Sequence, residues 1–255
     1  MIDRKKAQPE EFSETVVEGR NAVTEALKAG RTIDKIYIAS GDIDHGLRRI
    51  ASLARQAGIV VTQADRRKLD LMSQTGAHQG VIAMAAARNY VSVDQMLQTA
   101  AERGEKPLLI ICDELNDPHN LGAILRTAEC AGAHGVIIPK RRSAGLTATV
   151  AKASAGAIEY MPVAKVANLT DTIKKLKQEG VWIYGTAADG AKGLYETDLT
   201  GPAAIVIGNE GEGMSRLVAE QCDFLVSIPM KGQINSLNAS NAAAILLYEA
   251  LRQRG

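Results

Sequence analysis

The sequence predicts an α/β protein of two units, the second of which is a parallel sheet covered by helices on both faces. Strand-like and helix-like segments alternate along most of the 255 residues, as they do in parallel α/β folds. The pattern starts afresh after Pro107, where an apolar run typical of a strand buried on both faces begins. Apolar residues make up 46% of the chain, so a core can form without disulfide bonds or a structural metal.

The first part of the chain divides into a tail, a small unit and a linker. Residues 1–14 are polar and charged and are expected to form a flexible tail. In the unit 15–87 the residue pattern predicts helices over 21–29, 46–56 and 66–74, and strands over 33–39, 59–64 and 80–86. The more polar segment 88–106 is the expected linker, with one helix over 93–101.

The second unit, 107–255, continues the alternation to the end of the chain. Its pattern predicts strands over 108–115, 135–139, 181–187, 203–208 and 224–229, and helices over 121–131, 147–155, 169–179, 215–221 and 241–253. Strands that alternate with helices in this way form a parallel sheet with helices on both sides.

Charge and composition exclude several classes of protein. The 30 Lys and Arg residues against 29 Asp and Glu leave a net charge of +1, which excludes a strongly basic nucleic-acid coat but allows local basic patches. One such cluster, Lys140, Arg141 and Arg142, follows a predicted strand, where open α/β sheets bind ligands. A solvated basic turn explains these three residues equally well.

The sequence also indicates a soluble protein of the cytoplasm. The first residues have no apolar segment of the kind found in secretory signals. The longest apolar runs, 81–87 and 242–248, are far shorter than the roughly 18 residues of a membrane span. The three cysteines lie far apart and are expected to be small buried apolar groups in a reducing compartment.

The segment 116–126, NDPHNLGAILR, combines a turn with the start of a helix, which we expect near Asn120 or Leu121. A helix N-terminus followed by Arg126 suits a phosphate or a ribose. An ordinary capped helix with an exposed arginine is the alternative. His119, beside Asn120, is more often a structural or solvated group than a catalytic one.

A glycine-rich loop follows the predicted strand 203–208. Its glycines are spaced G-x-x-G-x-G, which is not the dinucleotide fingerprint G-x-G-x-x-G, and this argues against a nucleotide-dependent oxidoreductase. Glu210 and Glu212 would repel a phosphate, so a neutral or cationic ligand fits the loop better. A plain turn between strand and helix is the alternative.

Polar side chains crowd before the last predicted helix. Ser236, Asn238, Ser240 and Asn241 can each cap a helix, and a cap needs only one of them. The surplus indicates hydrogen bonding to something else.

Together these three segments resemble the motifs of the SpoU (TrmH-like) branch of the SPOUT RNA methyltransferases, closest to the RlmB type, which methylates a guanosine 2′-oxygen in 23S ribosomal RNA. The matching residues are Asn120, Gly122 and Arg126; IGNEGEGM (207–214); and IPM (228–230) with NSLNAS (235–240). EGRNAV (18–23) and AHQGVIA (77–83) resemble the family's small RNA-binding domain. Asn209 departs from the small residue that RlmB-type members often carry.

The resemblance implies a C-terminal trefoil knot, a homodimer with shared active sites, and S-adenosylmethionine bound in the knot. True knots are essentially absent from proteins in general, so this expectation comes from the family alone. By the same resemblance, the cofactor contacts are Thr186, Gly208, Ile228, Met230 and Leu237. The implied catalytic residues are Asn120, Arg126, Glu210, Ser236 and Asn238, and no metal is implied.

RNA recognition is expected to use shape and backbone contacts, because the first unit offers few aromatic side chains on which bases could stack. The candidate contacts are Arg20, Arg66, Arg67, His78 (by the resemblance) and Gln79, with Arg141 and Arg142 of the second unit.

The implied chemistry is in-line attack of a ribose 2′-oxygen on the donor methyl group, in which positioning contributes much of the rate. The family proposal makes Arg126 the general base, but the arginine pKa of about 12 or more makes proton removal difficult. Alternatively, Arg126 holds the adjacent phosphate and lowers the pKa of the hydroxyl. A transfer RNA substrate and a non-catalytic RNA-binding protein of the same fold are the competing interpretations.

Overall fold

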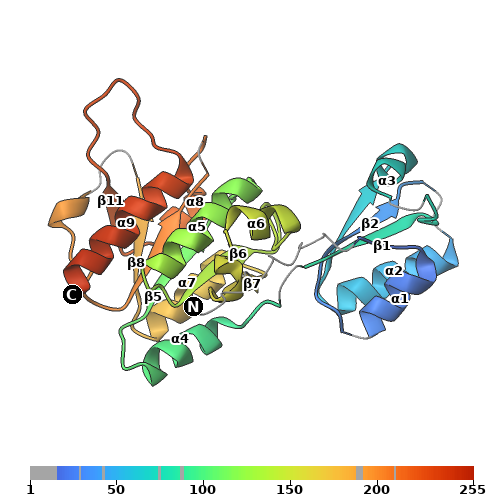
Figure 1. Ribbon diagram of the computed structural model, residues 1–255, viewed down its shortest axis with the longest axis horizontal. Coiled ribbons are helices and arrows are strands. Elements are labelled where there is room, and N and C mark those ends of the chain that lie inside the picture. Colours follow the sequence, from blue (N-terminus) through green and yellow to red (C-terminus); the bar gives the residue numbers. More distant parts are fainter. Residues whose placement is uncertain are drawn as a thin grey trace, which may run out of the picture.

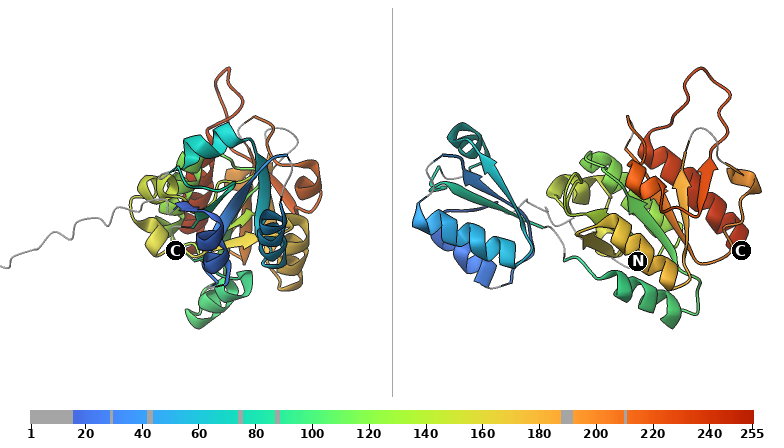
Figure 2. Two further views of the ribbon diagram at one scale, coloured as in Figure 1. Left: turned by 90° about the vertical axis from the view of Figure 1, so that its right-hand side faces the viewer. Right: turned by 180° about the vertical axis from the view of Figure 1, so that it is seen from behind.

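The computed structural model describes residues 16–28, 30–41, 44–73, 76–86, 89–187, 192–209 and 211–255. These residues form two α/β units that lie side by side along the long axis of the molecule (Figures 1 and 2). None of the helices in this described part of the chain has the length and apolar character that crossing a bilayer requires.

The first unit is a small mixed sheet with helices on both faces. Its strands, in the spatial order β1-β4-β2-β3, are β1 (Val16–Glu18), β4 (Val81–Ala85), β2 (Ile33–Ala39) and β3 (Val60–Ala64). β2 and β3 are parallel, whereas β4 runs antiparallel to both of its neighbours. The helices α1 (Arg20–Lys28) and α2 (His45–Gln56) pack on one face and α3 (Arg66–Met72) packs on the other.

The second unit confirms the predicted parallel sheet. It has seven strands in the order β7-β6-β5-β10-β8-β11-β9, and every neighbouring pair is parallel. The strands are β5 (Leu108–Cys112), β6 (Gly135–Pro139), β7 (Val163–Val166), β8 (Trp182–Thr186), β9 (Lys192–Gly193), β10 (Ala203–Ile207) and β11 (Phe224–Ser227).

Two helical layers bury this sheet. On one face lie α5 (Pro118–Cys130), α6 (Ala148–Ala153) and α9 (Ala239–Arg254), and on the other lie α4 (Val93–Glu102), α7 (Leu169–Gln178) and α8 (Arg216–Ala219). The short 3-10 helices η1 (Ala157–Glu159) and η2 (Leu194–Glu196) complete the unit. Every residue of β5 is buried, because its side chains enter both layers in alternation.

The order of the strands determines where a ligand can bind. From β5 the chain moves outward through β6 to β7, and it then returns to the opposite side of β5 to form β8, β10 and β11. This reversal is a topological switch point, and ligands of open α/β sheets bind beyond the carboxyl ends of the strands at such a point. All three segments singled out in the sequence follow strands at this edge.

The sequence predicted most of these elements and missed three of the strands, β1, β7 and β9, of which β9 has only two residues. β1 has three residues and β7 has four, and β7 carries Lys165, which interrupts the apolar pattern that predicts a strand. Lys165 is nevertheless largely buried, because it pairs with Asp34 of the first unit.

His134 fixes the end of the linker to the second sheet. Its Nδ1 accepts a hydrogen bond from the Leu108 N–H over 3.1 Å, so the ring proton lies on Nε2, 2.9 Å from the Glu105 carboxylate. Burial lowers the pKa of His134, although the hydrogen bond with Glu105 opposes this effect. The neutral ring is therefore the form that the fold requires.

We expect the free energy of unfolding to fall as the pH falls below about 6.5, because the unfolded chain then binds a proton at His134 that the folded chain resists. His134→Gln removes this contribution, so its unfolding free energy should decline less than that of the wild type between pH 7.5 and 5.5. Urea unfolding at several pH values measures the difference. His45→Gln, at an exposed histidine outside the linker contact, serves as the control for the substitution itself. Equal slopes for wild type and His134→Gln would contradict the assignment.

Candidate active site

The candidate site lies at the carboxyl edge of the second sheet. Thr186 ends β8, Gly208 follows β10 and Ile228 follows β11. Because β8 pairs with both β10 and β11, these three positions of the chain end side by side. The Thr186 hydroxyl donates to the Val206 carbonyl over 3.0 Å and ties the ends of β8 and β10 together.

The helix that carries the first motif begins earlier than the sequence predicted. α5 begins at Pro118, with the Asp117 side chain accepting from the His119 N–H over 2.9 Å, and not near Asn120 or Leu121. Proline is well suited to the first helical position because its missing N–H would have no partner there. Asn120 therefore lies inside the first turn, and it is 93% buried, with 7% of its surface exposed.

Gly122 has a packing role. It lies where α5 crosses α6, and a side-chain carbon at this position would approach the Val150 carbonyl oxygen to 2.9 Å and collide with Ala153. The glycine allows the two helices to approach closely, so its backbone faces α6 and not a ligand.

A side-chain hydrogen bond joins the first motif to the third. The Nδ2 of Asn238 donates to Oδ1 of Asn120 over 2.9 Å. The other atom of the same amide, Asn238 Oδ1, accepts from the N–H groups of Ser240 and Asn241 and so caps α9. One side chain thus starts the last helix and connects residues 118 positions apart in the chain.

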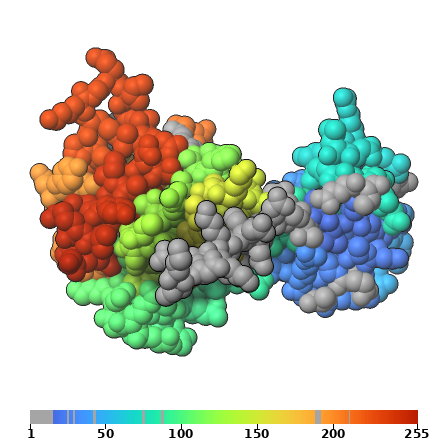
Figure 3. Space-filling view, viewed as in Figure 1, coloured from blue at the N-terminus to red at the C-terminus, as the bar shows by residue number. Residues whose placement is uncertain are grey.

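Both Arg126 and Ser236 are exposed, on the same two chain segments that carry this bond. Arg126 lies further along α5, and no hydrogen bond or ion pair joins it to another described residue. Ser236 precedes the cap of α9 in the segment 229–237, which forms a loop that stands clear of the surrounding surface (Figure 3). Glu210 lies outside the described residues.

The loop 229–237 has unused hydrogen-bonding capacity. No hydrogen bond joins its backbone N–H and C=O groups to the rest of the described chain. It also exposes apolar side chains, since 39% of Met230 and 74% of Ile234 are accessible. Leu237, near the end of the loop, is half-buried. Free backbone groups beside apolar side chains are what a small ligand with polar and apolar parts requires.

The glycine-rich loop is folded tightly against the end of β10. Asn209 and Gly213 exchange backbone hydrogen bonds of 3.0 and 2.9 Å, and a side-chain carbon at Gly208 would collide with the backbone of Gly213 and Met214. The Asn209 side chain accepts from the Gly211 N–H over 2.8 Å and donates to the Glu114 carbonyl over 3.2 Å. Asn209 therefore connects the glycine-rich loop to the loop after β5.

The loop after β5 contains two residues that sequence reasoning missed. Asp113 is 3% exposed, and its carboxylate accepts from the Ser215 N–H over 2.7 Å, which secures the far end of the glycine-rich loop. Glu114 adopts a left-handed backbone conformation with φ of 54° and accepts a hydrogen bond of 2.8 Å from Arg142. Their position directly after a buried strand was the available signal, because this is where α/β sheets place functional side chains.

The candidate RNA contacts fall into two groups. Arg20 and His78 stabilise the first unit: Arg20 pairs with Asp44 over 2.6 Å and donates to the Gln79 carbonyl, and His78 is buried and contacts Asp70 over 3.0 Å. The exposed positions are Arg66, Arg67, Gln79, Arg141 and Arg142. Gln79 is itself tied to the Arg20 N–H, and Arg142 to Glu114. RNA binding by all seven residues stays a prediction.

Two family models match this chain. The SpoU rRNA Methylase family matches residues 107–248, and the model for RNA 2′-O ribose methyltransferase substrate binding matches residues 16–91. Relatives include a putative TrmH family tRNA/rRNA methyltransferase from Bacillus subtilis, 49% identical over 92% of this chain and 94% of its own length. A relative from Staphylococcus aureus is 48% identical over 95% of this chain and 98% of its own length.

Solved structures give the same assignment. The SpoU methyltransferase AviRb from Streptomyces viridochromogenes, crystallised with AdoMet (S-adenosylmethionine), is 26% identical, has a TM-score of 0.60, and the match covers 95% of this chain and 91% of AviRb. An AdoMet-bound rRNA methyltransferase from Sinorhizobium meliloti is 25% identical, with a TM-score of 0.57 and coverage of 95% and 88%. The chain therefore belongs to the SpoU methylase family and is an RNA methyltransferase that carries its own substrate-binding unit.

Proposed function

We propose that this protein transfers a methyl group from S-adenosylmethionine to a ribose 2′-hydroxyl, that of a guanosine in 23S ribosomal RNA. The observation that carries the proposal is the hydrogen bond between Asn120 and Asn238. It brings the first and third motifs together beside the glycine-rich loop, at the edge of the sheet where α/β proteins bind ligands. The exposed Arg126 lies on the same helix as Asn120 and supplies the cation that an RNA phosphate requires.

The residues at this edge fit S-adenosylmethionine, which the family uses. The free backbone groups of 229–237 suit an adenine and a ribose, and the side chains of Ile228, Met230 and Leu237 suit the apolar faces of the same molecule. Thr186 and Gly208 lie at the ends of the neighbouring strands. When bound, the cofactor supplies an activated methyl group on a cationic sulfur.

The protein's own contribution is to position the ribose and favour its deprotonation. Arg126 has no anionic partner among the described residues, so all its donors are available to a phosphate. A guanidinium held there stabilises the negative charge that develops on the 2′-oxygen. Asn120 is held in place by Asn238 and by the packing around it, which makes it a rigid contact for the ribose. We therefore favour a clamp over a general base for Arg126, with the 2′-hydroxyl proton passing to water at this exposed position.

We also propose a homodimer. Helix α9 exposes 51% of Tyr248 and 40% of Leu251, two large apolar side chains spaced three residues apart on one face of the helix. A second copy of the chain would cover them. The free cysteines agree with the proposed cytoplasmic location. The expectation that all three are buried is wrong, since only Cys112 is buried, Cys222 is partly buried and Cys130 is exposed.

Mapping of 2′-O-methyl groups in total RNA, with and without the gene, tests the proposed function. We expect a single guanosine of 23S ribosomal RNA to lose its methyl group in the deletion strain and to regain it when the purified protein acts on deletion-strain RNA with S-adenosylmethionine. Loss of a methyl group from a transfer RNA instead would reassign the substrate. If the map of 2′-O-methyl groups is unchanged and calorimetry detects no binding of S-adenosylmethionine, the proposed methyl-transfer function is refuted.

Asn238→Ser separates the cap of α9 from the hydrogen bond to Asn120. Serine caps helices about as well as asparagine, so the variant should lose only the roughly 1 kcal/mol of stability that comes from the hydrogen bond to Asn120. The methyl-transfer rate should fall by at least about tenfold, since Asn120 loses the bond that orients it. Asn238→Ala is the matched variant and should lose about 1 kcal/mol more, because it also removes the cap. Wild-type rates in Asn238→Ser would show that the bond has no role in catalysis.

Arg126→Lys tests the clamp. Lysine keeps the charge but loses the planar fork that holds a phosphate through two hydrogen bonds, so we expect kcat/KM for RNA to fall by about 10-fold or more. The affinity for S-adenosylmethionine should not change. Arg66→Lys on the first unit is the control for general loss of arginine and should change KM alone. Near-wild-type activity in Arg126→Lys would remove Arg126 from any specific role.

A further inference from the structure

A buried ion pair joins the two units. Asp34, on β2 of the first unit, accepts a hydrogen bond from Lys165 of β7 in the second unit. The Asp34 side chain is 9% exposed and that of Lys165 is 12% exposed. Isolated charges are costly to bury, so each group depends on the other to remain there. The two residues are 131 positions apart in the sequence.

Tyr90, near the start of the linker, contacts both members of this ion pair. Its hydroxyl donates to the same Asp34 oxygen that pairs with Lys165 and accepts from the Leu146 N–H over 2.9 Å. Its ring lies 5.0 Å from the Lys165 ammonium. Burial, together with the neighbouring Asp34 charge, raises the pKa of Tyr90, so the hydroxyl keeps the proton that it donates.

The backbone of the second unit approaches Asp34 closely at Gly145. A side-chain carbon at this position would lie 2.7 Å from the Asp34 carboxyl carbon, so any other residue would force the Asp34 carboxylate to move. A second contact between the units runs from the Lys140 ammonium to the Gly58 carbonyl over 2.9 Å. We call Asp34, Tyr90, Gly145 and Lys165 the junction cluster.

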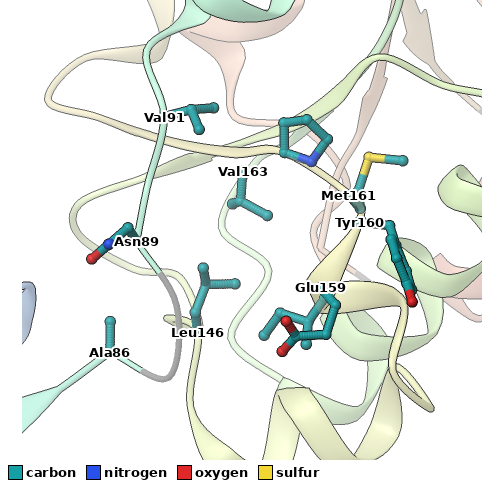
Figure 4. A pocket seen from close by; sticks show the side chains of 10 residues that line it. Ala86, Asn89, Val91, Leu146, Glu159, Tyr160, Met161 and Val163 are labelled. Atoms are coloured by element: carbon teal, nitrogen blue, oxygen red, sulfur yellow. The ribbon is translucent and has the colours of Figure 1, made fainter.

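Apolar packing alone does not hold the units in this arrangement. A cavity of about 390 Å³ opens beside the junction (Figure 4). It lies between Ala86 at the end of the first unit, the linker residues Asn89 and Val91, and the second-unit residues Leu146 and Val163. A loosely packed apolar contact allows sliding, whereas a buried ion pair with fixed hydrogen bonds specifies one register.

We propose that the junction cluster holds the substrate-binding unit at one distance and orientation from the methyl-transfer site, and thereby selects which ribose of the bound RNA reaches Asn120 and Arg126. This inference rests on the proposed function. The four residues are positioning residues: they touch neither RNA nor cofactor. An RNA bound to the first unit must extend to the methyl-transfer site of the second unit. A change in the angle between the units therefore brings a different nucleotide to that site.

The test replaces the charged pair by an apolar pair. Asp34→Leu with Lys165→Met removes both charges together, so neither is left buried alone. The control is Lys177→Met, which breaks a more exposed ion pair inside the second unit, Lys177 with Asp223 at 2.7 Å. Small-angle scattering reports the arrangement of the units, and calorimetry measures the affinity for S-adenosylmethionine. Methyl mapping on RNA from the deletion strain gives the methylated site and the rate of methylation.

We expect the double variant to have an affinity for S-adenosylmethionine within about twofold of the wild-type value and a KM for RNA within about threefold of it. The reason is that neither substitution removes a residue that contacts the cofactor or the RNA. Its kcat at the wild-type ribose should fall by about tenfold or more, with methyl groups appearing on neighbouring riboses. The distribution of distances between the two units, obtained from small-angle scattering, should broaden. Lys177→Met should match the wild type in each measurement.

Two milder variants keep the test decisive if the double variant does not fold. Tyr90→Phe removes one hydrogen bond to Asp34, and Gly145→Ala places a methyl group against the Asp34 carboxylate and disturbs its pairing with Lys165; both should spread methylation to neighbouring riboses. Wild-type kcat with a single methylated ribose in every folded variant overturns the junction cluster as a positioning device. A wild-type protein that methylates no ribose overturns the proposed function instead, and the scattering profiles then decide on the cluster alone.

Discussion

The second unit depends on one constraint: all its strands run in the same direction. Parallel strands cannot be joined by tight hairpins, so each connection must cross the sheet, and the loops that follow the strands all gather at one edge. The glycine-rich loop, the loop after β5 and the segment before α9 meet there for this reason. The side-chain bonds from Asn209 to Glu114 and from Asn238 to Asn120 then join loops that the sheet has already brought close.

Local patterns in the sequence predicted much of this arrangement. The run LLIIC fills both layers of the core as a strand buried on both faces should. Among the polar residues before α9, the one that caps the helix, Asn238, is also the one that bonds to Asn120. Pattern reasoning misplaced the start of α5, because Asp117 and Pro118 were interpreted as a turn and form instead the cap and first residue of the helix. A turn and a helix start use the same residue types, so the sequence alone does not distinguish them well.

The remaining features depend on residues far apart in the chain. The local sequence around Lys165 predicts a surface lysine, whereas in the fold this residue pairs with Asp34. In the same way Arg20 and His78 are free basic groups in the sequence, but they pair with Asp44 and Asp70 in the structure. Gly122 belongs to the first motif by its position, yet the requirement for a glycine arises from α6. In each case a partner on another element, absent from the local pattern, decides the role of the side chain.

The unsatisfied backbone of 229–237 has a consequence for turnover. In the absence of a ligand these polar groups are hydrated, and a bound molecule that engages them must first fix the conformation of the loop. Ordering a residue opposes binding by about 1–2 kcal/mol, so several ordered residues reduce the net affinity of even a well-matched ligand. The same free energy is recovered when the loop loosens again. A site built from such a segment can make many contacts during the reaction and still release its spent donor quickly.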